Sequence, residues 1–389
     1  MPLKPKTLFS YTFRPFFLLA GVWAILAVAR WMLVLNGAAA PPAGINPLYW
    51  HGHEMIVGFA LAVVAGFVLS AVATWTGRPA ISGFAVAWLV LSWLLGRIAM
   101  FSAVEMPPSL AAGLDMLFPL TLCFLLGREV FGARNRRNYK VFGIAALLAV
   151  LNLLYHLGMT GIIEGAEYIA IYLLIHGVIL LVALIGGRVV PNFTANWLRG
   201  QGITRLPQNN LAIDRISIAL TILLGLAVVF LPDRETVGYL ALAAAAVHAV
   251  RVANWCGLQT IRNPLLFVMH VAYWWLPIGY GMMSLASFGW AFTPTAALHA
   301  LVMGAIGGMI MAMITRVPLG HTGRALHASR LTVAAYVVLM LAVIVRVLSP
   351  WNEVHYLSMI NVAAAGWCLA FAIFLWVYWP VLTQPAVKP

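Results

Sequence analysis

The sequence contains very few charged residues. Asp, Glu, Lys and Arg make up 8% of its 389 residues, whereas hydrophobic residues make up 63%. A soluble chain of this length would carry about 25% charged residues, distributed over two or three domains. The shortage of charge excludes a soluble cytosolic, secreted or nucleic-acid-binding protein and indicates an integral membrane protein.

Cysteines and common catalytic motifs are also scarce. The three cysteines, Cys123, Cys256 and Cys368, stand singly, so they predict neither a disulfide framework nor a thiolate metal site. The sequence has no glycine-rich phosphate loop followed by Lys and Ser or Thr, no GxSxG motif and no HExxH motif. Nucleotide, serine-hydrolase and zincin chemistry are therefore not indicated.

Long apolar runs recur from end to end. Each run is near the length of about 20 residues that a helix needs to cross a hydrocarbon layer about 30 Å thick. The first run is too long for a signal peptide and predicts a retained helix. The sequence therefore predicts an all-α integral membrane protein, with one domain of twelve transmembrane helices over residues 1–389. The runs cover 15–36, 50–75, 82–103, 108–130, 140–160, 166–190, 212–231, 236–254, 264–288, 295–316, 329–349 and 356–379.

The distribution of positive charge predicts the orientation. The chain has 23 Lys and Arg against 10 Asp and Glu. When these cations are assigned to alternate loops, only Arg30, Arg97, Arg234 and Arg346 fall on one side of the membrane. Because loops rich in Lys and Arg stay in the cytoplasm, both termini are predicted to be cytoplasmic.

Three histidines are evenly spaced along the chain. His53, His176 and His299 stand 123 residues apart, and the same offset separates Arg128 from Arg251. Because four predicted helices lie between successive histidines, this period predicts three pseudo-symmetric four-helix repeats. Their approximate bounds are 10–130, 133–254 and 258–380.

This arrangement resembles the catalytic subunits of haem-copper oxidases and nitric-oxide reductases, which also group twelve helices in three sets of four. The sequence departs from that pattern in the run 212–231, which contains no histidine where paired copper ligands would be expected. A complete binuclear haem-copper centre is therefore not predicted.

Several histidines fall at the predicted outer ends of helices. Imidazole is a common metal ligand and a usual axial ligand of haem, so His51 or His53 opposite His299 predicts a haem site. Residues i and i+2 point about 200° apart on a helix. The second imidazole of the His51–His53 pair would therefore point elsewhere, for instance to a copper ion shared with His176. Glu54 would orient a ligating imidazole or, alternatively, favour the positive end of the helix dipole. A plainer alternative is that each histidine bonds a neighbouring helix.

A basic loop follows the run 295–316. Arg316, His321 and Arg324 stand there between glycines. Arginine side chains bind carboxylates through paired hydrogen bonds, so this loop is a candidate site for haem propionates or another anion. A loop that only fixes topology is the alternative. The prolines after the second, sixth and tenth runs, Pro79 and Pro191 among them, are predicted to stop their helices.

Seven motifs together resemble the NnrS family over essentially the full chain. They are Phe13-Arg14-Pro15-Phe16-Phe17, Trp50-His51-Gly52-His53-Glu54-Met55, Trp75-Thr76-Gly77-Arg78-Pro79, Arg136-Arg137-Asn138, Gly186-Gly187-Arg188-Val189-Val190-Pro191-Asn192-Phe193-Thr194, His270-Val271-Ala272-Tyr273, and the stretch from His299 to Gly320-His321-Thr322-Gly323-Arg324.

The resemblance implies a function. It implies a multi-pass protein of the bacterial inner membrane that carries haem b and copper and protects the cell against nitric oxide and nitrosative stress. Its metal ligands would come from the motif histidines, which here are His51, His53, His270, His299 and His321. Nitric oxide would be the small-molecule ligand, either bound or turned over as an oxidoreductase substrate, and the resemblance indicates no particular electron donor. The alternative function is transport of a metal or haem across the inner membrane.

Overall fold

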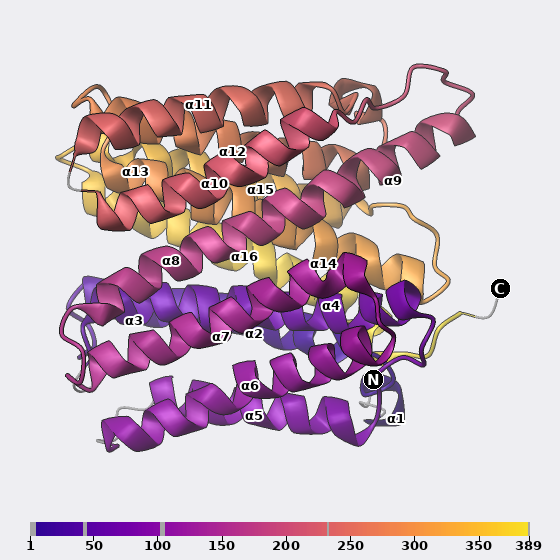
Figure 1. Ribbon diagram of the computed structural model, residues 1–389, viewed down its shortest axis with the longest axis horizontal. Coiled ribbons are helices and arrows are strands. Elements are labelled where there is room, and N and C mark those ends of the chain that lie inside the picture. The colour runs from indigo at the N-terminus through magenta and orange to yellow at the C-terminus, as the bar shows by residue number, and fades with distance from the viewer. Residues whose placement is uncertain (1–4, 42–44, 102–105, 232, 388–389) are drawn as a thin grey trace. The chain divides into compact units, whose positions relative to one another are not determined.

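The computed structural model describes residues 5–41, 45–101, 106–231 and 233–387. All regular elements in these ranges are helices, and twelve helical spans are long and apolar enough to cross a membrane. This finding confirms the predicted all-α, twelve-helix membrane fold. The chain forms two compact units (Figure 1). Unit 1 comprises Met1–Gly177, Val317–Arg324 and Phe374–Pro389, and unit 2 comprises Val178–Arg316 and Ala325–Ile373.

The first half of the chain supplies most of unit 1. Its helices α5, α6 and α7 follow one another in sequence and lie side by side (Figure 1). The elements are α1 (Pro5–Leu8), α2 (Phe13–Leu35), α3 (Pro47–His53), η1 (Glu54–Ala60), α4 (Leu61–Thr76), α5 (Phe84–Phe101), α6 (Pro108–Gly132), η2 (Arg136–Asn138), α7 (Tyr139–Met159) and α8 (Ala166–Leu181), the last of which continues into unit 2.

The second half supplies most of unit 2. Helices α10, α11 and α12 pack in sequence order there (Figure 1). The elements are η3 (Val182–Gly186), α9 (Gly187–Gly200), α10 (Leu211–Phe230), α11 (Arg234–Ala253), η4 (Gly257–Thr260), α12 (Pro264–Ser287), α13 (Pro294–His299), η5 (Ala300–Gly307), α14 (Gly308–His321), α15 (Arg330–Leu348), η6 (Ser349–Trp351) and α16 (Tyr356–Thr383), of which α14 and α16 also contribute to unit 1.

Three of the spans contain a π-helical segment. These segments are η1, η3 and η5, and they lie in the spans that contain His53, His176 and His299 respectively. The π-helical turn begins directly after His53 and directly after His299. Such turns are rare in proteins, and those that occur are often at functional sites. The three segments therefore mark these histidines as candidates.

Most helix bounds lie within a few residues of the prediction, but two predicted stops are wrong. The sixth span continues through Pro191 to Gly200, and the tenth continues through Pro318 to His321. A proline in a helix lacks one N–H and crowds the carbonyl four residues earlier. Residue Gly187 stands at that position for Pro191, just after the π-helical η3, where the hydrogen-bond register already changes.

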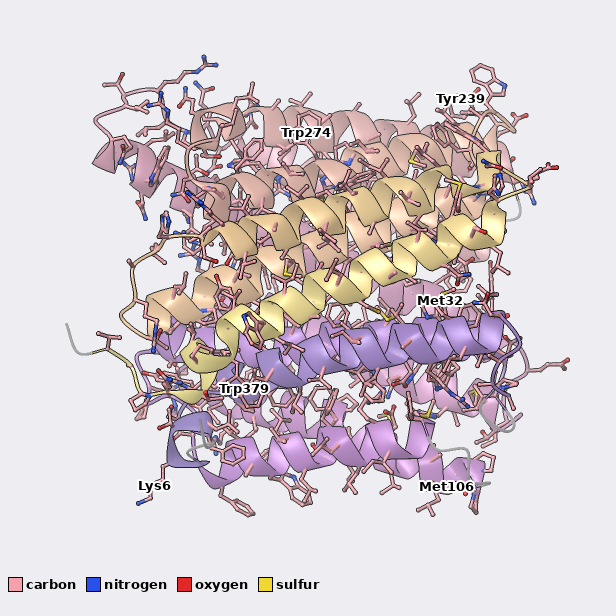
Figure 2. The ribbon with its side chains drawn as sticks, turned by 180° about the vertical axis from the view of Figure 1, so that it is seen from behind. Lys6, Met32, Met106, Tyr239, Trp274 and Trp379 are labelled. Carbon is pink, nitrogen blue, oxygen red and sulfur yellow. The ribbon has the colours of Figure 1, made fainter. Side chains whose placement is uncertain are left out.

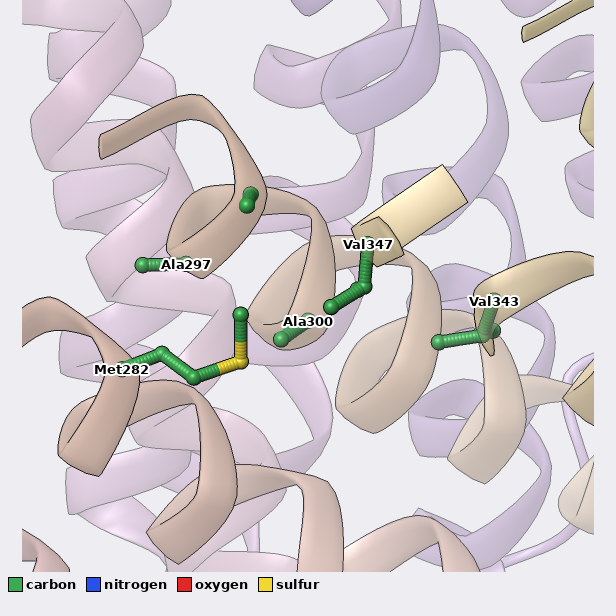
Figure 3. Close-up of a cluster of buried hydrophobic side chains, with 6 residues drawn as sticks. Met282, Ala297, Ala300, Val343 and Val347 are labelled. Atoms are coloured by element: carbon green, nitrogen blue, oxygen red, sulfur yellow. The ribbon is translucent and has the colours of Figure 1, made fainter. Parts of the chain in front are cut away.

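Small residues allow close helix packing in both units. In unit 1, a Cβ added at Gly21 of α2 would lie 2.9 Å from Leu375 Cδ2, in the C-terminal part of α16 that belongs to this unit; α2 contains the labelled Met32 and this part of α16 the labelled Trp379 in Figure 2. In unit 2, Ala297 and Ala300 pack with Val343 in a buried apolar cluster (Figure 3). Close van der Waals contact of this kind holds membrane helices together, because lipid removes most of the hydrophobic driving force between them.

Candidate functional site

Polar side chains from four spans of unit 1 meet in the interior. They come from the end of α3, the start of η1, and α5, α6 and α7. Every member is at most 3% exposed. Intramembrane ionisable residues are costly and are functional candidates by default. We call this group the unit 1 network, and its members are His53, Glu54, Arg97, Asp115, Asn152, Tyr155 and His156.

A buried guanidinium joins the two carboxylates of the unit 1 network. Arg97 Nη1 donates to Glu54 Oε2 at 2.5 Å, and Arg97 Nη2 donates to Asp115 Oδ1. The low-dielectric interior makes an unpaired charge expensive, so the three groups stabilise one another only as a set. The same contacts fix Asp115 with its second oxygen, Oδ2, turned toward the histidines.

Both ring nitrogens of His53 face hydrogen-bond acceptors. Nδ1 lies 2.9 Å from Glu54 Oε1, and Nε2 lies 2.9 Å from Asn152 Oδ1 and 3.3 Å from Asp115 Oδ2. The amide orientation of Asn152 follows from its Nδ2, which donates to Asp115 Oδ2 at 2.7 Å. His53 therefore donates from both nitrogens as an imidazolium. With this proton, the charges of His53 and Arg97 balance those of Glu54 and Asp115.

A second histidine shares the same carboxylate oxygen. His156 Nε2 lies 2.9 Å from Asp115 Oδ2. The ring of Tyr155 stacks on His53, with centroids 4.4 Å apart. One ligand atom each from His53, Asp115 and His156 lies within 4.8 Å of the others, which makes this trio a possible metal site within the described part of the chain.

Two glycines make room for the unit 1 network. A Cβ added at Gly96 would lie 2.8 Å from Asp115 Oδ1 and 3.0 Å from Asp115 Cα. A Cβ added at Gly58 would lie 2.8 Å from Arg97 Nη1 and closer still to the indole nitrogen of Trp23. The helices can therefore approach closely enough for the ion pairs only because both positions lack a side chain.

Unit 2 contains a separate buried network around Arg251. The guanidinium bonds Asp214 Oδ1, the carbonyl of Ala183 and the hydroxyl of Tyr273, each at 2.8 Å. His248 connects the same tyrosine hydroxyl, at 3.0 Å, to Thr221 Oγ1, also at 3.0 Å. Both nitrogens of His248 are therefore bonded within the protein.

Two of the predicted ligands share a different hydrogen-bonding state. His176 Nδ1 lies 2.9 Å from the carbonyl of Tyr172, and His299 Nδ1 lies 2.8 Å from the carbonyl of Thr295. A carbonyl only accepts, so Nδ1 carries a proton in both residues, and in the neutral imidazole Nε2 then carries the lone pair. His176 is 5% exposed, and its Nε2 has no hydrogen-bond partner among the described residues.

The remaining predicted histidines have varied surroundings. His51 is half-buried and stacks on Trp31 with centroids 4.8 Å apart. His270 Nε2 lies 2.9 Å from Thr194 Oγ1, and its buried Nδ1 has no hydrogen-bond partner among the residues that are described. His270 is buried, whereas His321 is exposed.

The two arginines predicted to bind an anion are in different units. Arg316, in unit 2, lies over the ring of Phe193 at 4.2 Å. Arg324, in unit 1, donates to the carbonyl of Pro385 at 3.4 Å. Each arginine is thus held by contacts within its own unit.

The structure brings together only some of the predicted site residues. His53 bonds Glu54, and it shares Asp115 Oδ2 with His156. The sequence did not predict Asp115 or Asn152 as members of the site. Arg97 lies inside α5, within the predicted run 82–103, and is 2% exposed. The available signal was the presence of a lone charge inside an apolar run, which applies to Arg97 and Asp115 alike.

The fold defines a class of membrane protein. A solved structure described as a cryo-EM structure of a heme-copper terminal oxidase dimer is similar to this chain, with a TM-score of 0.65. The match covers 97% of this chain and 85% of that chain at 12% sequence identity, so the likeness concerns the fold. None of the curated proteins matches this sequence significantly.

The sequence also has a recognisable family. The family model for NnrS protein matches residues 7–386, which is nearly the whole chain. The chain belongs to the NnrS family, and the resemblance carried by the sequence motifs is confirmed.

Proposed function

We propose that this protein binds haem b in the bacterial inner membrane and protects the cell by binding nitric oxide or reacting with it. The observation that carries the proposal is the hydrogen-bonding state of His176, whose buried Nε2 has a lone pair and no partner among the described residues. A haem ligand needs this state, in which the other ring nitrogen donates to a fixed acceptor. NnrS membership and the fold shared with a haem-copper oxidase support the same function.

Histidines of this chain have the hydrogen-bonding state that a haem ligand needs. His176 and His299 both have Nδ1 oriented by a backbone carbonyl, so their Nε2 atoms are suited to bind iron. His51 is a further candidate, because a residue two positions from His53 on a helix points about 200° away from it, and His53 faces the unit 1 network. A ferrous haem with an open position would supply tight binding of nitric oxide.

The side chains support the proposed haem type and second metal. The sequence has no CxxCH motif, which attaches c-type haem covalently, so the proposed haem is held only by its ligands and surroundings. Copper is the proposed second metal, because imidazole nitrogens suit it.

Orientation and internal symmetry belong to the same proposal. The excess of positive charge in one set of loops supports cytoplasmic termini. The three four-helix repeats are supported by the π-helical segments in the spans of His53, His176 and His299.

The test compares two buried histidines in the full chain, purified in detergent. His176→Gln removes the proposed ligand, whereas His248→Gln changes a histidine whose nitrogens are both bonded within unit 2. Haem per chain and the Soret shift on adding nitric oxide to reduced protein are measured for each. We expect His176→Gln to lose haem or change its spectrum, and His248→Gln to match the wild type.

Three results would contradict the proposal. The first is wild-type protein that lacks haem after expression in cells supplied with it. The second is an unchanged haem spectrum in His176→Gln together with His299→Gln. The third is haem or metal that exchanges freely during purification, which would favour the transport function instead.

A further inference from the structure

We propose that His53, Asp115 and His156 form a binding site for a divalent transition-metal cation inside unit 1. This site is distinct from the proposed haem ligands, His176 and His299. It rests on the geometry of the unit 1 network and does not depend on the proposed function.

Three donor atoms converge at this point. His53 Nε2 and His156 Nε2 lie 3.3 Å and 2.9 Å from the same atom, Asp115 Oδ2. Two imidazole nitrogens and one carboxylate oxygen are a donor set typical of Zn²⁺ and Fe²⁺ sites, and imidazole also suits Cu²⁺. Three protein ligands leave at least one coordination position open, as in catalytic rather than structural zinc sites.

The groups around these donors are arranged to orient them. Glu54 Oε1 lies 2.9 Å from His53 Nδ1, so it holds the nitrogen that does not face Asp115 Oδ2. A carboxylate on the second nitrogen is the usual outer partner of a metal-binding histidine. Arg97 bonds the other carboxylate oxygen of Asp115, Oδ1, and leaves Oδ2 to the histidines. Arg97 also pairs with Glu54, so the guanidinium charge is compensated away from the three metal donors.

A metal cation would bind at this site by replacing a proton of His53. His53 carries a proton on Nε2, and a cation bound there replaces that proton, which is released to solvent. His156 binds through Nε2 with its own proton moved to Nδ1. A divalent cation thus adds one net positive charge to the unit 1 network, and a small anion taken from solution, such as chloride, at the open position restores neutrality without releasing a further proton.

The experiment uses Zn²⁺ as the probe on the full chain in detergent. Protein from zinc-supplemented cells is washed with a mild chelator, and zinc and haem are counted per chain in the same sample. Zinc affinity is then measured by competition with a chromophoric chelator, and proton release is measured at pH 7. We expect one zinc per chain in the wild type and one proton released for each zinc bound.

Two nearly isosteric variants and one control locate the site. His156→Gln and Asp115→Asn each alter a direct donor and should weaken zinc binding by at least the roughly 10–100-fold that the loss of an outer partner costs. His248→Gln changes a buried histidine whose two nitrogens contact hydroxyl groups, and it should keep wild-type affinity. Haem content and thermal midpoint report whether each variant remains folded.

X-ray absorption at the zinc edge of the wild type keeps the proposal testable if a variant does not fold. The expected shell contains two imidazole nitrogens at about 2.0–2.1 Å and at least one oxygen at about 2.0–2.2 Å. The proposal is overturned by wild-type protein that retains no zinc, by zinc affinity unchanged in folded His156→Gln and Asp115→Asn, or by a shell without imidazole. Haem without zinc would refute this site alone, whereas zinc without haem would refute only the proposed function.

Discussion

Replacing Arg97 with methionine should destabilise the protein strongly. The guanidinium is 2% exposed and is the group that bonds both Glu54 and Asp115. Methionine has a similar length and is apolar, so Arg97→Met removes the charge while leaving most of the volume filled. The unit 1 network then contains two carboxylates against one imidazolium, at His53, and one buried negative charge is left uncompensated.

The expected loss of unfolding free energy follows from removing one partner of a buried ion pair and leaving the other in place. Such a change costs about 3–5 kcal/mol, because the remaining charge has lost its partner but stays out of water. Glu54→Gln should cost a similar amount by leaving one positive charge in excess. The double variant of Arg97 and Glu54 restores the balance between His53 and Asp115, so its cost should fall short of the sum by about 2–3 kcal/mol.

The assay is unfolding by SDS in mixed micelles, followed by tryptophan fluorescence, with chelator present so that no metal compensates the charge. The control is Arg78→Met. Arg78 Nε lies 2.6 Å from Glu129 Oε2, but the arginine side chain is 41% exposed, and such pairs contribute about 0–1 kcal/mol. An Arg97→Met loss no larger than the Arg78→Met loss, or strictly additive effects of Arg97→Met and Glu54→Gln, would refute the charge balance described here.

Two further predictions concern a close contact and a helix start. Gly187→Ala should lower unfolding stability in the same assay by about 1–3 kcal/mol, because the new Cβ would overlap the guanidinium of Arg251; wild-type stability would contradict this packing. At the start of α11, hydrogen bonds from the Thr236 hydroxyl and the Glu235 and Thr236 amides to Asp233 lower its pKa. This cap should therefore stabilise the helix at neutral pH and weaken as pH falls through that lowered pKa, whereas Asp233→Asn should make amide hydrogen exchange in the first turn independent of this titration.

Much of the fold could be predicted from the sequence because lipid imposes simple limits on it. Each apolar run had to satisfy its backbone hydrogen bonds within one helix, so run length alone fixed the number of spans. The π-helical segments and the continuation through Pro191 were not predictable in this way. They depend on which carbonyls find partners after the helices have packed.

The candidate site was only partly predictable for a similar reason. His53 stands out as the second histidine of a His-x-His motif, which Glu54 follows directly, but Asn152 and Arg97, which they contact, are on other helices. Hydropathy places Arg97 inside an apolar run but names no partner for it, whereas packing places it between two carboxylates. Which helices meet, and at what rotation, is decided by long-range contacts that no local pattern contains.

The π-helical segment η1 accommodates one extra residue in the second span. A π-helical turn contains one residue more than an α-helical turn, so η1 acts as a one-residue insertion between His53 and α4 that is absorbed within the turn. Deleting one residue between Glu54 and Leu61 would therefore return the turn to α-helical geometry and leave His53 close to its present orientation relative to α4. A one-residue deletion in the regular α-helix of α4 would instead rotate the residues on its two sides by about 100° relative to each other, because each residue of an α-helix advances it by that angle.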